Sequence, residues 1–173
     1  MATEDYDRLL IDLLEGWQPD LHGTLLFLLN EDRVLLIRKK RGHGAGKING
    51  PGGKIDPGET PLSAAIRETE EETGVRVRDA SLAAEFRFLD LFDQQWYGYV
   101  FIARAWQGTP VETAEAVPFW CPVSELPFDQ MWEDDRLWLP RVLAGERLCG
   151  DFLFDRGRLL AHRLGSLEHT GRS

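Results

Sequence analysis

The chain has 173 residues, 43% of them hydrophobic, with a formal net charge of −9 and a pI near 4.9. This length suffices for one domain with a well-developed hydrophobic core and is short for two. The acidic balance excludes the broad basic surface that binds long nucleic acid through its phosphates, whereas a small polyphosphate bridged by a metal ion stays compatible. We therefore expect a single domain.

Cysteine usage and hydropathy indicate the compartment. The chain contains two cysteines, Cys121 and Cys149, and its acidic N-terminus shows no signal-peptide pattern. No apolar run reaches membrane-spanning length. We expect a soluble, cytoplasmic protein with no membrane partner, in which both thiols stay reduced. A disulfide between them is the alternative that the sequence leaves open.

The first segment, residues 1–20, has apolar residues at helical spacing between acidic ones. Its apolar stripe consists of Tyr6, Leu9, Leu10, Leu13, Leu14 and Trp17. We predict an amphipathic helical extension whose stripe covers the domain of a monomer, because packing is the common use of such a stripe. A dimer contact is the alternative.

Beyond this extension, apolar runs bounded by turn residues predict strands at 24–29, 34–38, 82–90, 94–106, 117–121, 148–154 and 158–163. Helices are expected at about 61–73 and from Asp134 to about Ala144, the second with Pro140 inside it. Strands grouped around a long helix favour an α/β fold in which a mixed sheet lies between helices. We assign this domain to residues 21–163 and expect residues 164–173 to form a polar tail.

The helix at 61–73 has clear signals at both ends. Thr60 can cap its N-terminus with the side-chain oxygen, and Gly74 can end it. Pro61 suits the first turn, because its missing N–H has no intrahelical partner there. These local signals fix the helix ends and hence the direction of its side chains.

Three glutamates of this helix, Glu68, Glu71 and Glu72, stand at i, i+3 and i+4 and therefore share one face. Closely packed carboxylates repel one another, and hard oxygen donors of this kind suit Mg²⁺ or Mn²⁺, which also bridge phosphate oxygens. Arg67 is expected to orient one of the glutamates through an ion pair. A solvated acidic face is the alternative for a run of glutamates taken alone.

The run from Gly53 to Val75, GKIDPGETPLSAAIRETEEETGV, resembles the Nudix box. Its glycine, glutamate and arginine positions all fit that pattern, and Thr69 departs from it at a position where an aliphatic residue is usual. The resemblance implies the Nudix α/β/α sandwich with a mixed β-sheet. It also implies metal-dependent hydrolysis of a nucleoside diphosphate linked to another moiety.

Two further stretches narrow the substrate. Residues 39–54, KKRGHGAGKINGPGGK, and residues 126–135, LPFDQMWEDD, closely resemble the MutT-homologue branch of 8-oxo-dGTP diphosphatases, and the likeness runs from about residue 22 to 154. It implies hydrolysis of oxidised purine nucleoside triphosphates, such as 8-oxo-dGTP and 2-hydroxy-dATP, to the monophosphate and pyrophosphate. Such an enzyme would sanitise the nucleotide pool.

The resemblance assigns roles to individual residues. Trp132 matches a stacking surface for the purine, while Asn49 and the two aspartates after Glu133 match positions at the base edge. The full set implied to bind substrate is Thr24, Lys39, Asn49, Pro51, Gly52, Gly53, Lys54, Trp132, Glu133, Asp134 and Asp135. Helix capping and complementation of the helix dipole by the aspartates, and a core role for Trp132, are the alternatives.

The catalytic set implied by the resemblance is Arg67, Glu68, Glu71 and Glu72. The implied metal ligands are the Gly52 carbonyl oxygen and the carboxylates of Glu68, Glu71, Glu72 and Glu115. Mg²⁺ is the expected ion and Mn²⁺ the alternative. One glutamate would take a proton from the attacking water; we expect Glu71 or Glu72, with Glu115 as the competitor.

Asp134 and Asp135 are adjacent carboxylates that should not both stay ionised. One can keep a proton and donate a hydrogen bond, so an exchange of protonation would admit both oxidised guanine and oxidised adenine. The family pattern has aromatic residues where this chain has His43, Ile48 and Pro51, so we expect the pocket wall to differ there.

Two other functions are compatible with the box. A Nudix hydrolase of ADP-ribose, NADH, a dinucleoside polyphosphate or capped RNA would share it, but Asn49 and the segment 132–135 disfavour that function. A non-catalytic nucleotide-binding Nudix module would be expected to have lost metal glutamates, and all of them are present here.

Overall fold

The computed structural model describes residues 2–168. Its α-helices are α1 (Thr3–Leu14), α2 (Pro61–Thr73) and α3 (Asp135–Leu143). Its strands are β1 (Leu21–Asn30), β2 (Arg33–Lys39), β3 (Ile48–Asn49), β4 (Gly52–Lys54), β5 (Ser81–Asp90), β6 (Trp96–Ala103), β7 (Ala116–Pro122), β8 (Leu148–Asp155) and β9 (Arg158–Ser166). Two short 3₁₀ helices, η1 (Val123–Glu125) and η2 (Phe128–Gln130), lie between β7 and α3.

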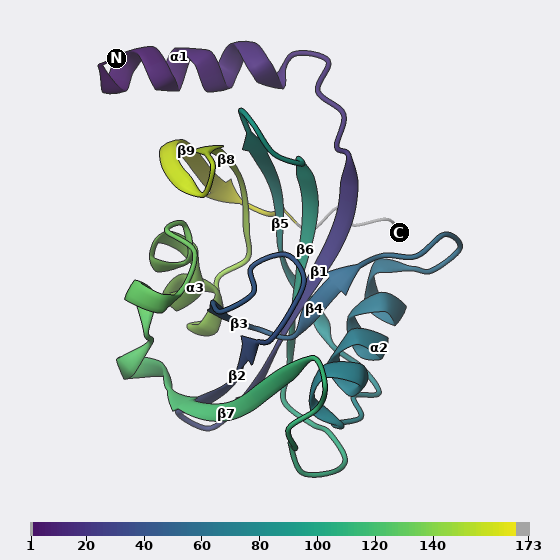
Figure 1. The fold of residues 1–173 in the computed structure, drawn as a ribbon. Coiled ribbons are helices and arrows are strands. Elements are labelled where there is room, and N and C mark those ends of the chain that lie inside the picture. Colours follow the sequence, from purple (N-terminus) through teal and green to yellow (C-terminus); the bar gives the residue numbers. More distant parts are fainter. Residues whose placement is uncertain (1, 169–173) are drawn as a thin grey trace.

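A mixed sheet forms the centre of the fold (Figure 1). Its strand order is β3-β2-β1-β6-β5-β8-β9, with β4 paired to β1 and β7 paired to β2. The β1–β6 and β5–β8 pairs are parallel, whereas β1–β2 and β5–β6 are antiparallel. In Figure 1, α2 lies on one side of the strands and α3 on the other. The α/β/α sandwich expected from the sequence is confirmed.

Side chains of β1 contribute to the packing on both faces of the sheet. Phe27 belongs to a buried cluster that contains Trp138 of α3, whereas Leu26 and Leu28 belong to a second cluster with Ala65 of α2. Successive side chains of a strand point to opposite faces, so a strand that is apolar throughout can be covered by helices on both sides. This packing holds β1 in place and fixes the position of β4 beside it.

The predicted end signals of α2 are all used. Ser63 N–H donates to the Thr60 side chain at 3.1 Å, Pro61 occupies the first turn, and Gly74 ends the helix with φ of 76°. A residue without Cβ adopts this left-handed conformation without strain. Because β4 pairs with β1 and contacts α2, the backbone of this short strand lies against the glutamates of the helix.

The helix α1 packs against β8 and β9. Leu10 is fully buried in a cluster with Leu89, Leu153 and Ala161, so most of the predicted stripe packs on the rest of the chain, whereas Leu13 is 36% exposed. Ile11, on another side of the helix, is 53% exposed. Among residues 2–168, no helix combines the length and the apolar character that crossing a bilayer needs.

Several element boundaries differ from the expectations. β6 is shorter than the predicted strand at 94–106, and β3 and β4 within the glycine-rich loop were not predicted. β9 continues to Ser166, so the expected polar tail does not begin at 164. The reason is pairing, because Leu148 at the start of β8 lies opposite Ser166. Residues 169–173 of that tail lie outside the described residues.

Candidate active site

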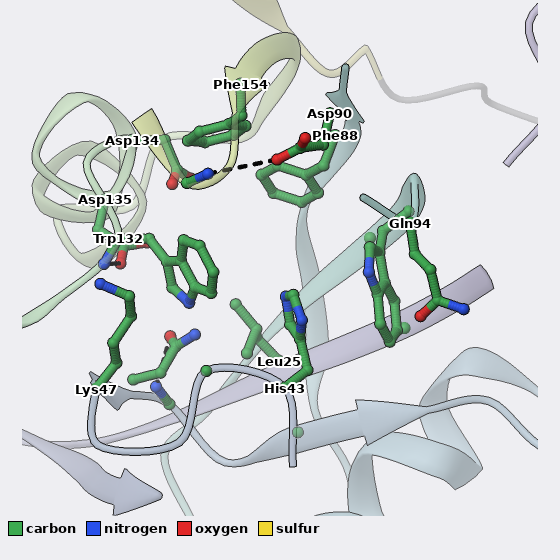
Figure 2. Close-up of a pocket in the computed structure, with 18 of the residues that line it drawn as sticks. Leu25, His43, Lys47, Phe88, Asp90, Gln94, Trp132, Asp134, Asp135 and Phe154 are labelled. Atoms are coloured by element: carbon green, nitrogen blue, oxygen red, sulfur yellow. Dashed lines mark hydrogen bonds between the residues drawn. The ribbon is translucent and has the colours of Figure 1, made fainter. Parts of the chain in front are cut away.

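A cavity of about 520 Å³ opens between the loop before β3, the β5–β6 hairpin and the segment that leads into α3 (Figure 2). Its volume falls in the range of small-ligand sites. The structure brings most of the predicted substrate-binding residues together in its lining, namely Thr24, Lys39, Asn49, Gly52, Gly53, Trp132, Asp134 and Asp135.

Three of the predicted substrate-binding residues, Pro51, Lys54 and Glu133, are not part of this lining. The buried Pro51 accepts a hydrogen bond from a backbone N–H of β1 at 2.8 Å. The Lys54 carbonyl oxygen accepts one from Arg67 at 3.1 Å, and the Glu133 carboxylate accepts one from Leu159 N–H at 2.5 Å. These contacts hold the segments that carry the lining residues.

The glutamates of α2 differ in burial. Glu72 is 3% exposed, and its Oε1 accepts a hydrogen bond from Gly52 N–H at 2.8 Å. Burial raises the pKa of Glu72 to about 7, against the opposing effects of that hydrogen bond and of the Lys39 charge. Glu68 packs so tightly on Gly53 that a methyl group there would come within 2.6 Å of its carboxyl carbon. Burial also raises the pKa of Glu68.

Arg67 donates hydrogen bonds to three carboxylates at once and forms an ion pair with a fourth, that of Asp56, at 3.4 Å. Its Nε and Nη2 donate to the two oxygens of Glu59 at 2.8 Å each, and its Nη1 donates to Glu68 at 2.9 Å and Glu71 at 3.2 Å. The bidentate hydrogen bonds lower the pKa of Glu59 to about 2. The predicted ion pair between Arg67 and a glutamate is confirmed.

The carboxylate of Glu115 contacts Arg41, and this hydrogen bond lowers the pKa of Glu115. Among residues 2–168, no three Asp, Glu, His or Cys side chains are already arranged as a metal site, and arginines pair with Glu68, Glu71 and Glu115. The donor chemistry nevertheless fits a divalent cation. The α2 face offers oxygen donors alone, and burial disfavours the charge of Glu68 and Glu72, which a hard cation would neutralise.

Asp134 and Asp135 lie beside Trp132 (Figure 2), where they are 3% and 2% exposed. Asp134 Oδ2 accepts a hydrogen bond from Trp138 Nε1 at 2.8 Å, and Asp135 Oδ2 accepts one from Trp132 N–H at 3.1 Å. Burial raises the pKa of Asp134 to about 6; burial and then the charge of Asp134 raise the pKa of Asp135 well above its ordinary value. Asp134 makes no side-chain capping bond to α3, so the capping alternative does not account for it.

Trp132 is half-buried and belongs to none of the buried apolar clusters of the described residues. The His43 ring stacks on it with 5.2 Å between ring centroids and 15° between planes. The Lys47 ammonium lies 4.9 Å from the Trp132 ring centroid. Trp132 is therefore a wall of the cavity, and the core alternative is not supported.

The site predicted from the sequence did not include several residues that line the cavity, among them Lys47, Phe88, Trp96 and Arg156, and it named His43 only as a place where the wall would differ. The departure from the family pattern at His43 was the one signal that pointed to this part of the wall. Neither a spacing nor a motif marks Lys47 or Trp96. Their proximity to Trp132 arises when the glycine-rich loop and the β5–β6 hairpin meet across the sheet.

The NUDIX domain family matches residues 21–142 of the chain. The chain belongs to the Nudix family. The oxidized purine nucleoside triphosphate hydrolases of Danio rerio and Mus musculus are 39% and 37% identical to it over 147 residues, which cover 84% of this chain and 94% of each relative. The crystal structure of the MutT protein from Bacillus halodurans has a TM-score of 0.72 and 28% identity, and the match covers 83% of this chain and 97% of that one. These likenesses confirm that the chain is a Nudix hydrolase.

Proposed function

We propose that this Nudix hydrolase cleaves oxidised purine nucleoside triphosphates, of the 8-oxo-dGTP and 2-hydroxy-dATP type, into the monophosphate and pyrophosphate. The activity would sanitise the nucleotide pool. One observation carries the proposal: the buried aspartates Asp134 and Asp135 lie beside Trp132 in the same cavity as Gly52 and Gly53. The names of the relatives from Danio rerio and Mus musculus support the same substrate class.

Recognition of the base follows from the chemistry of the cavity wall. An indole face such as that of Trp132 stacks on a purine without regard to its substituents. Asn49, Asp134 and Asp135 supply hydrogen-bonding groups for its edge. Because the pKa values of both aspartates are raised, one of them keeps a proton near neutral pH and can donate. A pair that can donate or accept suits both oxidised guanine and oxidised adenine.

The phosphates belong at the other end of the cavity, where Gly52, Gly53 and Lys39 lie against the glutamates of α2. We propose that Glu68, Glu71 and Glu72, with the Gly52 carbonyl oxygen and Glu115, hold Mg²⁺ there. The ion would supply neutralisation of phosphate charge and a lowered pKa of bound water.

We propose that one of the same glutamates takes the proton from the attacking water. With a pKa of about 7, Glu72 exchanges a proton readily at neutral pH, which suits a general base. Glu71 is more exposed and is held by Arg67 at 3.2 Å. Our proposal assigns the base to this pair, with Glu72 favoured by its burial.

The test is steady-state hydrolysis with Mg²⁺ of 8-oxo-dGTP, 2-hydroxy-dATP, dGTP, dATP, ADP-ribose and a dinucleoside tetraphosphate by the wild type and Glu72→Gln. We expect the oxidised purines to have the highest kcat/KM and Glu72→Gln to abolish their turnover. Preference for ADP-ribose or the dinucleotide would keep the Nudix chemistry and overturn the base site. Turnover of none of these would favour a binding module.

We also propose that the protein works as a cytoplasmic monomer. Cys121 and Cys149 are free thiols, which suits a reducing compartment. The stripe of α1 packs on its own chain, which supports the monomer.

A further inference from the structure

One wall of the cavity carries a buried donor without a partner. Trp96, the first residue of β6, lines the cavity, and its Nε1 is buried with no hydrogen-bond partner among residues 2–168. Thr24 Oγ1, in the same cavity, is also buried and unpaired within that part of the chain. Buried polar groups in native proteins nearly always have partners. Two unpaired groups on residues that line one cavity therefore point to a partner that a ligand supplies.

The contacts of the Trp96 ring place it close to the expected phosphate end of the cavity. A methyl group on Gly23 would approach the Trp96 ring to 2.9 Å and the Gly53 carbonyl oxygen to 3.3 Å. The Trp96 ring thus borders the glycine backbone that packs on Glu68. Because Gly23 has no side chain, the indole can lie directly over the β1 backbone.

On its other side, Trp96 is separated from the base site by His43. The His43 ring centroid is 5.5 Å from that of Trp96 and 5.2 Å from that of Trp132. In Figure 2, His43 lies on the side of Trp132 that faces away from Asp134 and Asp135. Trp96 therefore stands between the two ends of the cavity that would hold the base and the phosphates.

We propose that Trp96 is a specificity-determining residue that donates its indole N–H to a hydroxyl of the nucleotide sugar. The inference rests on the proposed function, because the sugar joins a base on Trp132 to phosphates beside Gly52 and Gly53. A sugar hydroxyl can accept this hydrogen bond. The base edge and the phosphates have other partners, whereas Trp96 Nε1 has none among the described residues.

The His43 ring covers this part of the wall, so it withdraws from Trp96 when the sugar enters. Gly42 and Gly44 on either side of it adopt the left-handed conformation, with φ of 81° and 78°. The indole N–H then gains a partner on binding.

The test is isothermal titration calorimetry with three product analogues, which needs no turnover. The ligands are 8-oxo-dGMP, its ribo counterpart and its 2′,3′-dideoxy counterpart, each titrated into the wild type and Trp96→Phe. Phenylalanine keeps an aromatic wall and removes the N–H. The matched control is Trp106→Phe, which alters an indole that packs on Trp120 at 5.3 Å, outside the lining of the cavity.

We expect the wild type to bind the dideoxy analogue about tenfold more weakly than at least one of the two analogues that carry a sugar hydroxyl. In Trp96→Phe, this difference in affinity should be lost. Trp106→Phe should keep it. Equal wild-type affinities for all three ligands would overturn the inference, even if Trp96→Phe fails to fold. So would an unchanged difference in Trp96→Phe.

The two proposals fail in distinguishable ways. If the triphosphate panel shows no preference for oxidised purines but the sugar preference depends on Trp96, the proposed substrate is wrong and the inference on the sugar stands. If the panel supports oxidised purines and the sugar preference is absent, the role of Trp96 is wrong. If none of the three analogues binds, the role of Trp96 is wrong, whatever the triphosphate panel shows.

Discussion

At the residue scale, Asp134 makes stability depend on pH. Its pKa of about 6, against an ordinary value of 3.8, means that the folded chain binds this proton more tightly than the unfolded chain. The resulting stabilisation is fully present below about pH 4 and is lost as the pH rises to about 6. We predict that Asp134→Asn, which does not ionise, gains about 1–3 kcal/mol in unfolding free energy relative to the wild type between pH 4 and pH 7. Urea unfolding across this range measures the gain.

The control for this prediction is Asp129→Asn, because the Asp129 side chain is fully exposed in η2. Its stability should follow that of the wild type at every pH. A difference between Asp134→Asn and the wild type that stays constant with pH would show that Asp134 does not titrate as its burial implies.

Asp134 and Asp135 should also govern which oxidised purine the enzyme prefers. Asp134→Asn and Asp135→Asn each fix one member of the pair as an amide, so the exchange of protonation between them is lost. We predict that each variant shifts the ratio of kcat/KM for 8-oxo-dGTP over that for 2-hydroxy-dATP by about tenfold, which corresponds to one hydrogen bond. Unchanged ratios in both variants would count against a shared proton.

Arg67 supports a third prediction at this scale. Lysine cannot reproduce a bidentate pair with Glu59 while also reaching Glu68 and Glu71. We predict that Arg67→Lys lowers kcat/KM by about 10- to 100-fold and raises the Mg²⁺ concentration needed for half-maximal activity. Arg76→Lys is the control, because Arg76 is exposed and pairs with Glu70. An unchanged Mg²⁺ requirement in Arg67→Lys would contradict the positioning role.

At the scale of elements, α1 provides a clean comparison of two neighbouring residues. Leu10 is fully buried among Leu89, Leu153 and Ala161, whereas Ile11 is 53% exposed. We predict that Leu10→Ala lowers the unfolding free energy by about 2–4 kcal/mol and that Ile11→Ala changes it by less than about 0.5 kcal/mol. Denaturant unfolding at two protein concentrations measures both. A large, concentration-dependent loss in Ile11→Ala would instead indicate the dimer contact.

The sequence predicted well those elements whose ends are set by residues close to them in the chain. The ends of α2 follow from Thr60, Pro61 and Gly74, which act within one turn of the helix. The limits of β9 and the existence of β3 and β4 depend on strand partners distant in the sequence. No local pattern contains that information, so these features had to be observed.

At the scale of the whole molecule, the residues of the site also divide into those that the local sequence predicts and those that depend on contacts between distant segments. The box led to the glutamates of α2, and the segment 132–135 led to Trp132, Asp134 and Asp135, because each of these sets is nearly contiguous in sequence. The wall formed by His43 and Trp96 joins two loops that meet across the sheet. The contact between Glu115 and Arg41 likewise depends on the tertiary structure, so neither could be predicted from spacing.

The buried negative charge of the α2 face should link metal binding to the stability of the whole domain. Because burial raises the pKa of Glu72 to about 7, its ionised form destabilises the metal-free fold at pH 8, and a bound cation offsets this effect. We predict that Mg²⁺ at 10 to 100 times its Kd raises the unfolding free energy of the wild type by about 1.4–2.7 kcal/mol. Glu72→Gln should be more stable than the wild type without metal and should gain less from Mg²⁺. Thermal unfolding measured with EDTA, with Mg²⁺ and with NaCl at the ionic strength of the Mg²⁺ sample tests this prediction. If NaCl raises the stability of the wild type as much as Mg²⁺ does, the effect is charge screening and not metal binding.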